Sequence, residues 1–133
     1  MSNVSLGNHL AVFAAEADRN RIRDFYCGVL GCEALVKTDA IDRLRLGDTH
    51  FCFVYQTTAL APDHFVGATY LELSAEDAEG LRRRIEAFGV RTLDTSDPHL
   101  YFQAPGGQVF RVVARDEDLS TYETSTSTRP VTG

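Results

Sequence analysis

The sequence has no excess of positive charge and no long apolar run. Its 13 Lys and Arg residues are outnumbered by 19 Asp and Glu residues, which gives a formal net charge of −6. Nucleic acids and anionic membranes are bound through basic surfaces, so this balance argues against both as partners. No stretch reaches the ~20 apolar residues of a transmembrane helix. The first ten residues, MSNVSLGNHL, lack the basic start and apolar segment of a signal peptide.

Cysteine is scarce, and several catalytic motifs are missing. Three cysteines are an odd number, and nothing points to export, so we expect reduced thiols and a cytoplasmic location. The sequence has no nucleophile elbow of a Ser-His-Asp hydrolase, no P-loop and no Gly-rich dinucleotide-binding turn. The length of 133 residues, with 44% hydrophobic and 24% charged residues, is ordinary for one globular domain.

The sequence contains two halves that resemble each other. Each half begins with an alternating segment, NHLAVFAAEAD or GATYLELSAED, and continues into a stretch with helical apolar spacing. Each half ends in a hairpin, IDRLRLGDTHFCFVY or HLYFQAPGGQVFRVV. We therefore predict a single domain over residues 1–133, built from two β-α-β-β-β modules at about 8–57 and 66–115. Residues 116–133 are expected to form a polar C-terminal tail.

Three segments, NHLAVF, RDFYCGVLG and LYFQAPGGQVFRVV, carry a family resemblance. They resemble the vicinal oxygen chelate superfamily, which includes glyoxalases, fosfomycin-resistance enzymes, extradiol dioxygenases and bleomycin-binding proteins. The resemblance extends over about residues 8–115. It implies an α+β fold in which two βαβββ modules form a curled mixed sheet around a cavity, usually in a homodimer.

Alternation along the predicted strands separates a face toward the helices from a face toward the cavity. We assign Leu44, Leu46, Cys52 and Val54 to the helix face of the first module, and Leu71, Leu73, Phe102, Phe110 and Val112 to that of the second. A small-molecule pocket needs aromatic surface and a few polar groups. The predicted ligand-binding residues on the cavity face are His9, Phe13, Arg43, Phe53, Tyr55, Tyr70, Glu72, Tyr101 and Arg111.

The resemblance also implies where a metal would bind. In metal-dependent relatives, up to four positions hold His, Glu or Gln around a divalent ion. The resemblance places these positions at His9, Phe53, Ala68 and Arg111. Only His9 can ligate, because phenyl and methyl groups have no lone pair and a guanidinium stays protonated. We therefore predict no metal and no other cofactor; the alternative is a displaced metal held by His9 with Glu72 or His64.

Arg111 lies between apolar residues of the last strand and needs a partner or a wet cavity. One interpretation is an ion pair with Glu72 that fills the place of the metal. The other is that Arg111, with Arg43 and Arg45 further out, captures an anionic group on a planar ligand. For Arg43 and Arg45, solvation at the rim of the cavity is a further possibility.

Three functions remain open. The first, which we favour, is a metal-free protein that binds an aromatic or amphipathic small molecule. The second is a metal-dependent lyase or dioxygenase. The third is a metal-free enzyme in which His9 and Glu72 are the catalytic acid–base candidates and Arg111 stabilises an oxyanion. The remaining histidines, His50, His64 and His99, are expected to be exposed.

Overall fold

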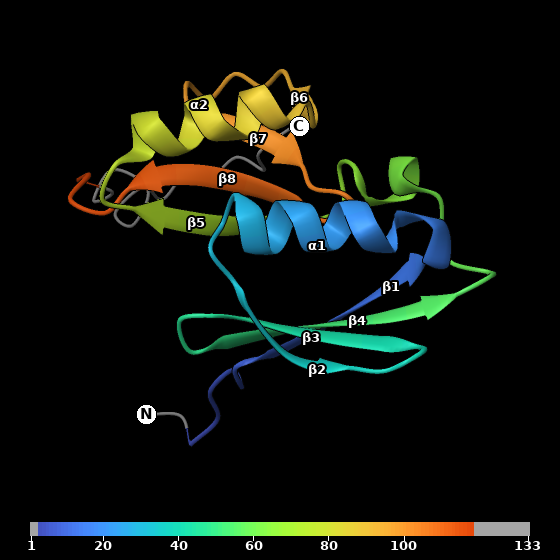
Figure 1. Ribbon diagram of the computed structural model, residues 1–133. Helices are drawn as coiled ribbons and strands as arrows, with labels where there is room; N and C mark the ends of the chain where they lie inside the picture. The colour runs from blue at the N-terminus through green and yellow to red at the C-terminus, as the bar shows by residue number, and fades with distance from the viewer. Residues whose placement is uncertain (1–2, 119–133) are drawn as a thin grey trace. The chain divides into compact units, whose positions relative to one another are not determined.

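The computed structural model describes residues 3–118 and consists of two compact units with their boundary between Leu60 and Ala61. Each unit is one βαβββ module (Figure 1). The first comprises β1 (His9–Ala15), α1 (Arg19–Gly28), β2 (Glu33–Lys37), β3 (Ile41–Leu46) and β4 (Thr49–Gln56). The second comprises β5 (Leu71–Ala75), α2 (Ala78–Phe88), β6 (Arg91–Leu93), β7 (Leu100–Gln103) and β8 (Val109–Ala114). The predicted α+β class and the two modules are confirmed; residues 119–133 of the predicted tail lie outside the described residues.

The first module is a four-stranded mixed sheet with the strand order β1-β4-β3-β2. β1 runs parallel to β4, and the other neighbours are antiparallel. The apolar stripe of α1 buries Ile22, Phe25 and Tyr26 completely. Burial of a large apolar side chain contributes about 1.5–3 kcal/mol, so this stripe fixes α1 on the sheet.

The second module repeats the arrangement with the strand order β5-β8-β7-β6. Its core contains Phe102 and Phe110, whose rings stack with centroids 5.5 Å apart, together with Leu81 and Ile85 of α2. In both modules the parallel pair brings together the first and last strands of the module, which lie far apart in the sequence.

Local signals set the ends of α2. The side chain of Asp77 caps its first turn by accepting a hydrogen bond of 2.9 Å from the backbone N–H of Gly80. Gly89 ends the helix in the left-handed region, with φ of 92°, a conformation that glycine adopts without strain. Between residues 3 and 118, no helix has the length and apolar character needed to cross a bilayer.

Candidate functional site

β4 turns its aromatic side chains toward α1. The ring of Tyr26 lies 5.3 Å from that of Phe51 and 4.8 Å from that of Phe53, between centroids, and both phenylalanines are buried. Tyr55 lies on the same face and donates a hydrogen bond of 2.9 Å to the carboxylate of Asp42. The predicted placement of Phe53 and Tyr55 on the cavity face is therefore wrong.

Alternation alone cannot decide which of the two faces of a strand packs on the helix. Because side chains two residues apart share a face, a shift of one residue exchanges the two sets. The aromatic set buries more apolar area than the alternative set, so α1 packs on the aromatic residues. Cys52 and Val54, for which the alternation predicts the helix face, lie on the opposite side of the sheet.

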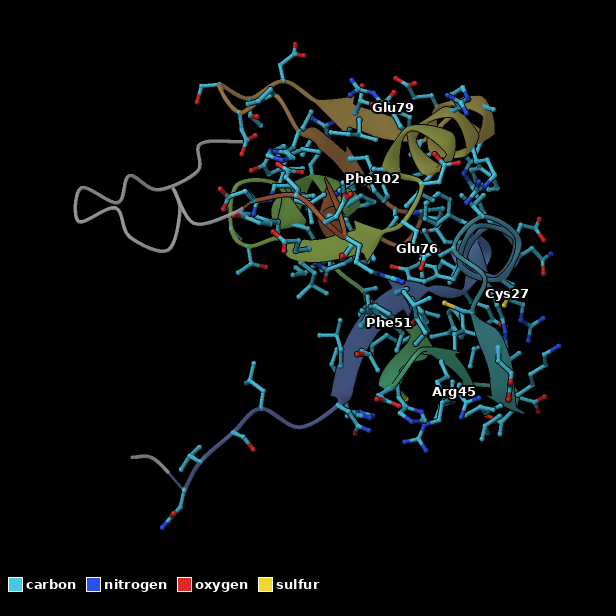
Figure 2. The ribbon with its side chains drawn as sticks, turned by 90° about the vertical axis from the view of Figure 1, so that its left-hand side faces the viewer. Cys27, Arg45, Phe51, Glu76, Glu79 and Phe102 are labelled. Atoms are coloured by element: carbon cyan, nitrogen blue, oxygen red, sulfur yellow. The ribbon has the colours of Figure 1, made fainter. Side chains whose placement is uncertain are left out.

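We call the side of the first sheet that points away from α1 the open face. Figure 2 shows Arg45 of the open face and Phe51 of the helix face on opposite sides of this sheet. The strand register arranges the open face in three rows, His9–His50–Arg45, Ala11–Cys52–Arg43 and Phe13–Val54–Ile41. The predicted residues His9, Phe13 and Arg43 therefore share one surface.

This open face is polar at one end and apolar at the other. At the polar end, Arg45 forms an ion pair of 3.2 Å with Glu33 of β2. Nδ1 of His50 is buried and has no hydrogen-bond partner among residues 3–118. At the apolar end, Phe13 is 51% exposed, which is unusual for a phenylalanine in the middle of a strand. Such a combination of apolar surface and few polar groups suits a small molecule.

In the second module, Arg111 lies in a network of ion pairs. It donates to Oε2 of Glu72, its register partner on β5, and at 3.2 Å to Oδ2 of Asp97. The Arg111 side chain is only 7% exposed. Burial by itself would lower the pKa of Arg111, but the hydrogen bond to Glu72 and the interactions with Tyr101 and Tyr70 together outweigh it and raise that pKa. Arg111 is therefore a permanent cation whose charge is neutralised by two carboxylates.

The two predicted aromatic ligand contacts of this module belong to the same network. The guanidinium carbon of Arg111 lies 5.4 Å from the ring centroid of Tyr70, and the Tyr70 and Tyr101 rings meet edge to face at 5.3 Å. The hydroxyl of Tyr101 donates to Asp97 at 3.0 Å. The sequence predicts the ion pair of Arg111 with Glu72 as one of two interpretations, but it gives no sign that Asp97 is a second partner.

His99 lies between two carboxylates at the start of β7. Its Nδ1 is 2.5 Å from Oδ1 of Asp97, and its Nε2 contacts Oε2 of Glu117. A neutral imidazole carries one N–H, so donation to both carboxylates requires the imidazolium form. Burial alone would lower the pKa of His99, but its bonds to Asp97 and Glu117 raise it. The expectation that His99 is exposed is wrong, because its side chain is 11% exposed.

We expect alkaline pH to destabilise the protein through His99. The pKa of an unfolded histidine is near ~6.5, and the folded value is higher. The stabilisation from His99 is therefore complete below about pH 6.5 and is lost as the pH rises through the folded pKa. Urea unfolding at a series of pH values should show this loss in the wild type and not in His99→Gln. The exposed His64 supplies the control, since His64→Gln should keep the wild-type profile; a wild-type profile that is flat above neutral pH would contradict the assignment.

A second charged cluster lies beneath α1. Asp42 of β3 is fully buried and accepts hydrogen bonds from Arg23 at 2.8 and 2.9 Å, from Arg19 at 3.1 Å and from Tyr55. Burial raises the pKa of Asp42, but these hydrogen bonds outweigh it and hold the pKa below its usual value. All four side chains are engaged within the module, so we interpret the cluster as structural. The alternation IDRLRL already places Asp42 on the helix face with Leu44, a signal that sequence reasoning missed.

The four positions implied for a metal do not supply a ligand set. His9 is exposed at the start of β1, Phe53 packs under α1, Ala68 precedes β5, and Arg111 is held by carboxylates. Among residues 3–118, no group of three or more His, Cys, Asp or Glu side chains could hold a metal ion. The donor chemistry therefore does not fit a divalent ion at these positions.

His9 and Glu72, the predicted acid–base candidates, belong to different modules. His9 pairs in register with His50, and Glu72 contacts Arg111. Catalysis by His9 and Glu72 together stays a prediction.

The second module also contains a cavity of about 380 Å³ on the side of α2. Its lining comes from the first turn of α2, residues 98–100 and the end of β8. Three carboxylates of the lining are engaged within the module: Glu76 with Arg115, Asp77 with the first turn of α2, and Glu117 with His99. The cavity lies on the α2 side of the second sheet, whereas Tyr101 and Arg111, two of the predicted ligand contacts, lie on the other side of that sheet.

Comparison with known proteins identifies the same fold. A model of the Glyoxalase/Bleomycin resistance protein/Dioxygenase superfamily matches residues 8–118. No curated protein sequence matches the chain.

Several solved structures are similar along most of the chain. A mutant of the fosfomycin resistance protein FosX from Listeria monocytogenes, complexed with Mn(II) and 1S,2S-dihydroxypropylphosphonic acid, has a TM-score of 0.70 at 12% identity, covering 89% of this chain and 97% of that chain. FosX from Mesorhizobium loti has a TM-score of 0.66 at 11% identity, covering 90% and 97%. TnmS3, an antibiotic binding protein from Streptomyces sp. CB03234, has a TM-score of 0.61 at 18% identity, covering 86% and 98%. At these identities the likeness concerns the fold.

Proposed function

Because the chain belongs to the Glyoxalase/Bleomycin resistance protein/Dioxygenase superfamily, we propose that it is a small-molecule binding protein that lacks the divalent-metal site of its metal-dependent relatives. Its ligand is aromatic or amphipathic and binds on the open face of the first module. The homodimer and the cytoplasmic location stay predictions from the sequence.

One observation carries this proposal: a permanent cation lies at one of the four positions where the family resemblance implies a metal ligand. Arg111 is buried there between Glu72 and Asp97. A guanidinium cannot donate a lone pair, and its charge repels a metal ion. The two carboxylates, which could otherwise ligate, are occupied by Arg111. The similar structures include both a Mn(II) complex and an antibiotic binding protein, and the residues of this chain favour the binding function.

The open face of the first module supports the location of the ligand. Phe13 is 51% exposed, with Ile41 and Val54 in the same row. The side chains on the corresponding face of the second module are already buried, since Tyr101, Val109 and Val113 are each less than 5% exposed. An apolar ligand therefore gains more buried area on the first module.

We expect an aromatic small molecule to raise the melting temperature in the presence of EDTA. Stabilisation reaches about 2.7 kcal/mol when the ligand is at roughly 100 times its Kd. Phe13→Ala removes apolar contact area and should weaken binding, measured as the ligand concentration needed for a given thermal shift. Leu60→Ala, at an exposed apolar residue outside the strands of the first module, should bind like the wild type. Stabilisation that requires an added divalent metal would contradict the proposed function.

A further inference from the structure

Arg43 differs from the other arginines that lie in strands. Arg45, Arg91 and Arg111 each form ion pairs with carboxylates of their own module. Arg43 has no ion pair and no side-chain hydrogen bond to any residue between 3 and 118. It lies in the middle of the open face and is partly buried, whereas Arg45 is exposed. No side-chain nitrogen of Arg43 is both buried and unpaired, so its guanidinium reaches solvent and an anion can approach it.

The neighbours of Arg43 on the open face carry no negative charge. Its register partners are Cys52 on β4 and Val36 on β2, and Ala11 of β1 lies beyond Cys52 in the same row. On one side of this row lie the imidazoles of His9 and His50. Glu33, the carboxylate next to Arg45, is already paired with that arginine, so an anion placed beside Arg43 would meet hydrogen-bond donors without facing an unpaired carboxylate.

The apolar row of the open face lies on the other side of Arg43, and strand geometry gives its distance from Arg43. Ile41 is two residues away along β3, and a strand rises about 3.3 Å per residue, so the apolar row lies about 7 Å from the Arg43 row. Phe13 and Val54 complete that row across β1 and β4. A molecule that uses both rows needs an anionic group about 7 Å from the middle of its apolar part.

We propose that the open face recognises a small organic anion with an aromatic or apolar body. Arg43 pairs with the anionic group, and the body lies on Phe13, Ile41 and Val54. The proposal rests on the proposed function and specifies the chemical class of its ligand. Carboxylate, sulfonate and phosphonate groups share the required charge and acceptor oxygens. Arg111 cannot play this part, because Glu72 and Asp97 already neutralise it.

Two fluorescent probes with the same ring system test the proposal. 1-Anilinonaphthalene-8-sulfonate carries a sulfonate, and N-phenyl-1-naphthylamine is its neutral counterpart. Titration of the natively folded protein should show tighter binding of the sulfonate. Arg43→Gln should weaken binding of the sulfonate about tenfold, which corresponds to 1.4 kcal/mol, and leave the neutral probe unchanged. Arg84→Gln, at an exposed arginine of α2 in the second module, is the control for the loss of one positive charge, and it should change neither affinity.

The outcomes separate this proposal from the proposed function. Equal sulfonate affinity in the wild type and in Arg43→Gln would overturn the anion site. If Phe13→Ala still weakens both probes in that case, the open face remains the binding surface and only the ligand class is wrong. If Phe13→Ala leaves both affinities unchanged, the open face is not the site and both proposals fail. Circular dichroism of each variant confirms that the comparison is made between folded proteins.

Discussion

Replacement of Asp42 by alanine is expected to lower the free energy of unfolding by about 3 kcal/mol. Loss of one partner of a buried ion pair costs about 3–5 kcal/mol, because the remaining charge stays buried. The cost falls toward the lower end here, since the side chains of Arg19 and Arg23 are 14% and 31% exposed and can reach water. For a chain of this size, we expect the melting temperature to fall by about 10 °C.

Two further variants separate the charge of Asp42 from its hydrogen bonds. Tyr55→Phe removes one donor to the carboxylate and should cost about 1 kcal/mol. Asp39→Ala, at an exposed aspartate in the turn before β3, should stay within about 0.5 kcal/mol of the wild type. Urea unfolding measures all three. A loss below about 1 kcal/mol for Asp42→Ala would show that α1 is held without this cluster.

The second large effect is expected at Arg111. Arg111→Met keeps the apolar volume but leaves Glu72 without its cation and leaves Asp97 with His99 as its cationic partner. We expect a loss of about 2–3 kcal/mol, because Asp97 is 10% exposed while Glu72 is 35% exposed and partly screened by water. The same substitution at Arg115 is the control, since Arg115 pairs with Glu76 at 3.0 Å but both side chains are mostly exposed. Arg115→Met should cost less than about 1 kcal/mol.

A compensating variant checks the cause of this loss. Glu72→Gln in the Arg111→Met background removes the carboxylate that is left without its cation. The double variant should therefore be more stable than Arg111→Met alone. If the double variant is less stable, the loss comes from packing of the arginine side chain and not from charge.

Much of the fold follows from the sequence because its signals are local. The two alternating segments, the apolar stripes and the capping residues Asp77 and Gly89 each act over a few residues. In the second module the faces are also predicted correctly, because the apolar residues Phe110 and Val112 alternate there with the charged Arg111. The polar residue identifies the face that does not pack on α2.

In the first module the same reasoning fails at β4. Apart from His50 at its start, the segment HFCFVY is apolar on both faces, so the alternation gives little to mark the face away from α1. Only the contact between Tyr26 and the phenylalanines decides which set is buried. Phe53 and Tyr55 therefore pack against α1 and do not lie at the predicted site, while Cys52 and Val54 lie on the open face.

The charged cluster around His99 could not be predicted from spacing. Asp97 and His99 are close in the sequence, but Glu117 and Arg111 reach them only through the pairing of β7 with β8. His99 next to Pro98 has the local sequence of a surface turn, and its burial depends on these distant partners. The sequence therefore predicts Arg111 as a residue that needs a partner, while the number and identity of its partners come from the fold.

The central claim is that this protein binds its ligand without a divalent metal. The most direct test is equilibrium dialysis of the untagged protein against Mn²⁺, Fe²⁺, Ni²⁺ and Zn²⁺ in turn, followed by elemental analysis. We predict far less than one ion per chain for every metal, with no difference between the wild type and His9→Ala. One tightly held ion per chain that is lost in His9→Ala would contradict the account.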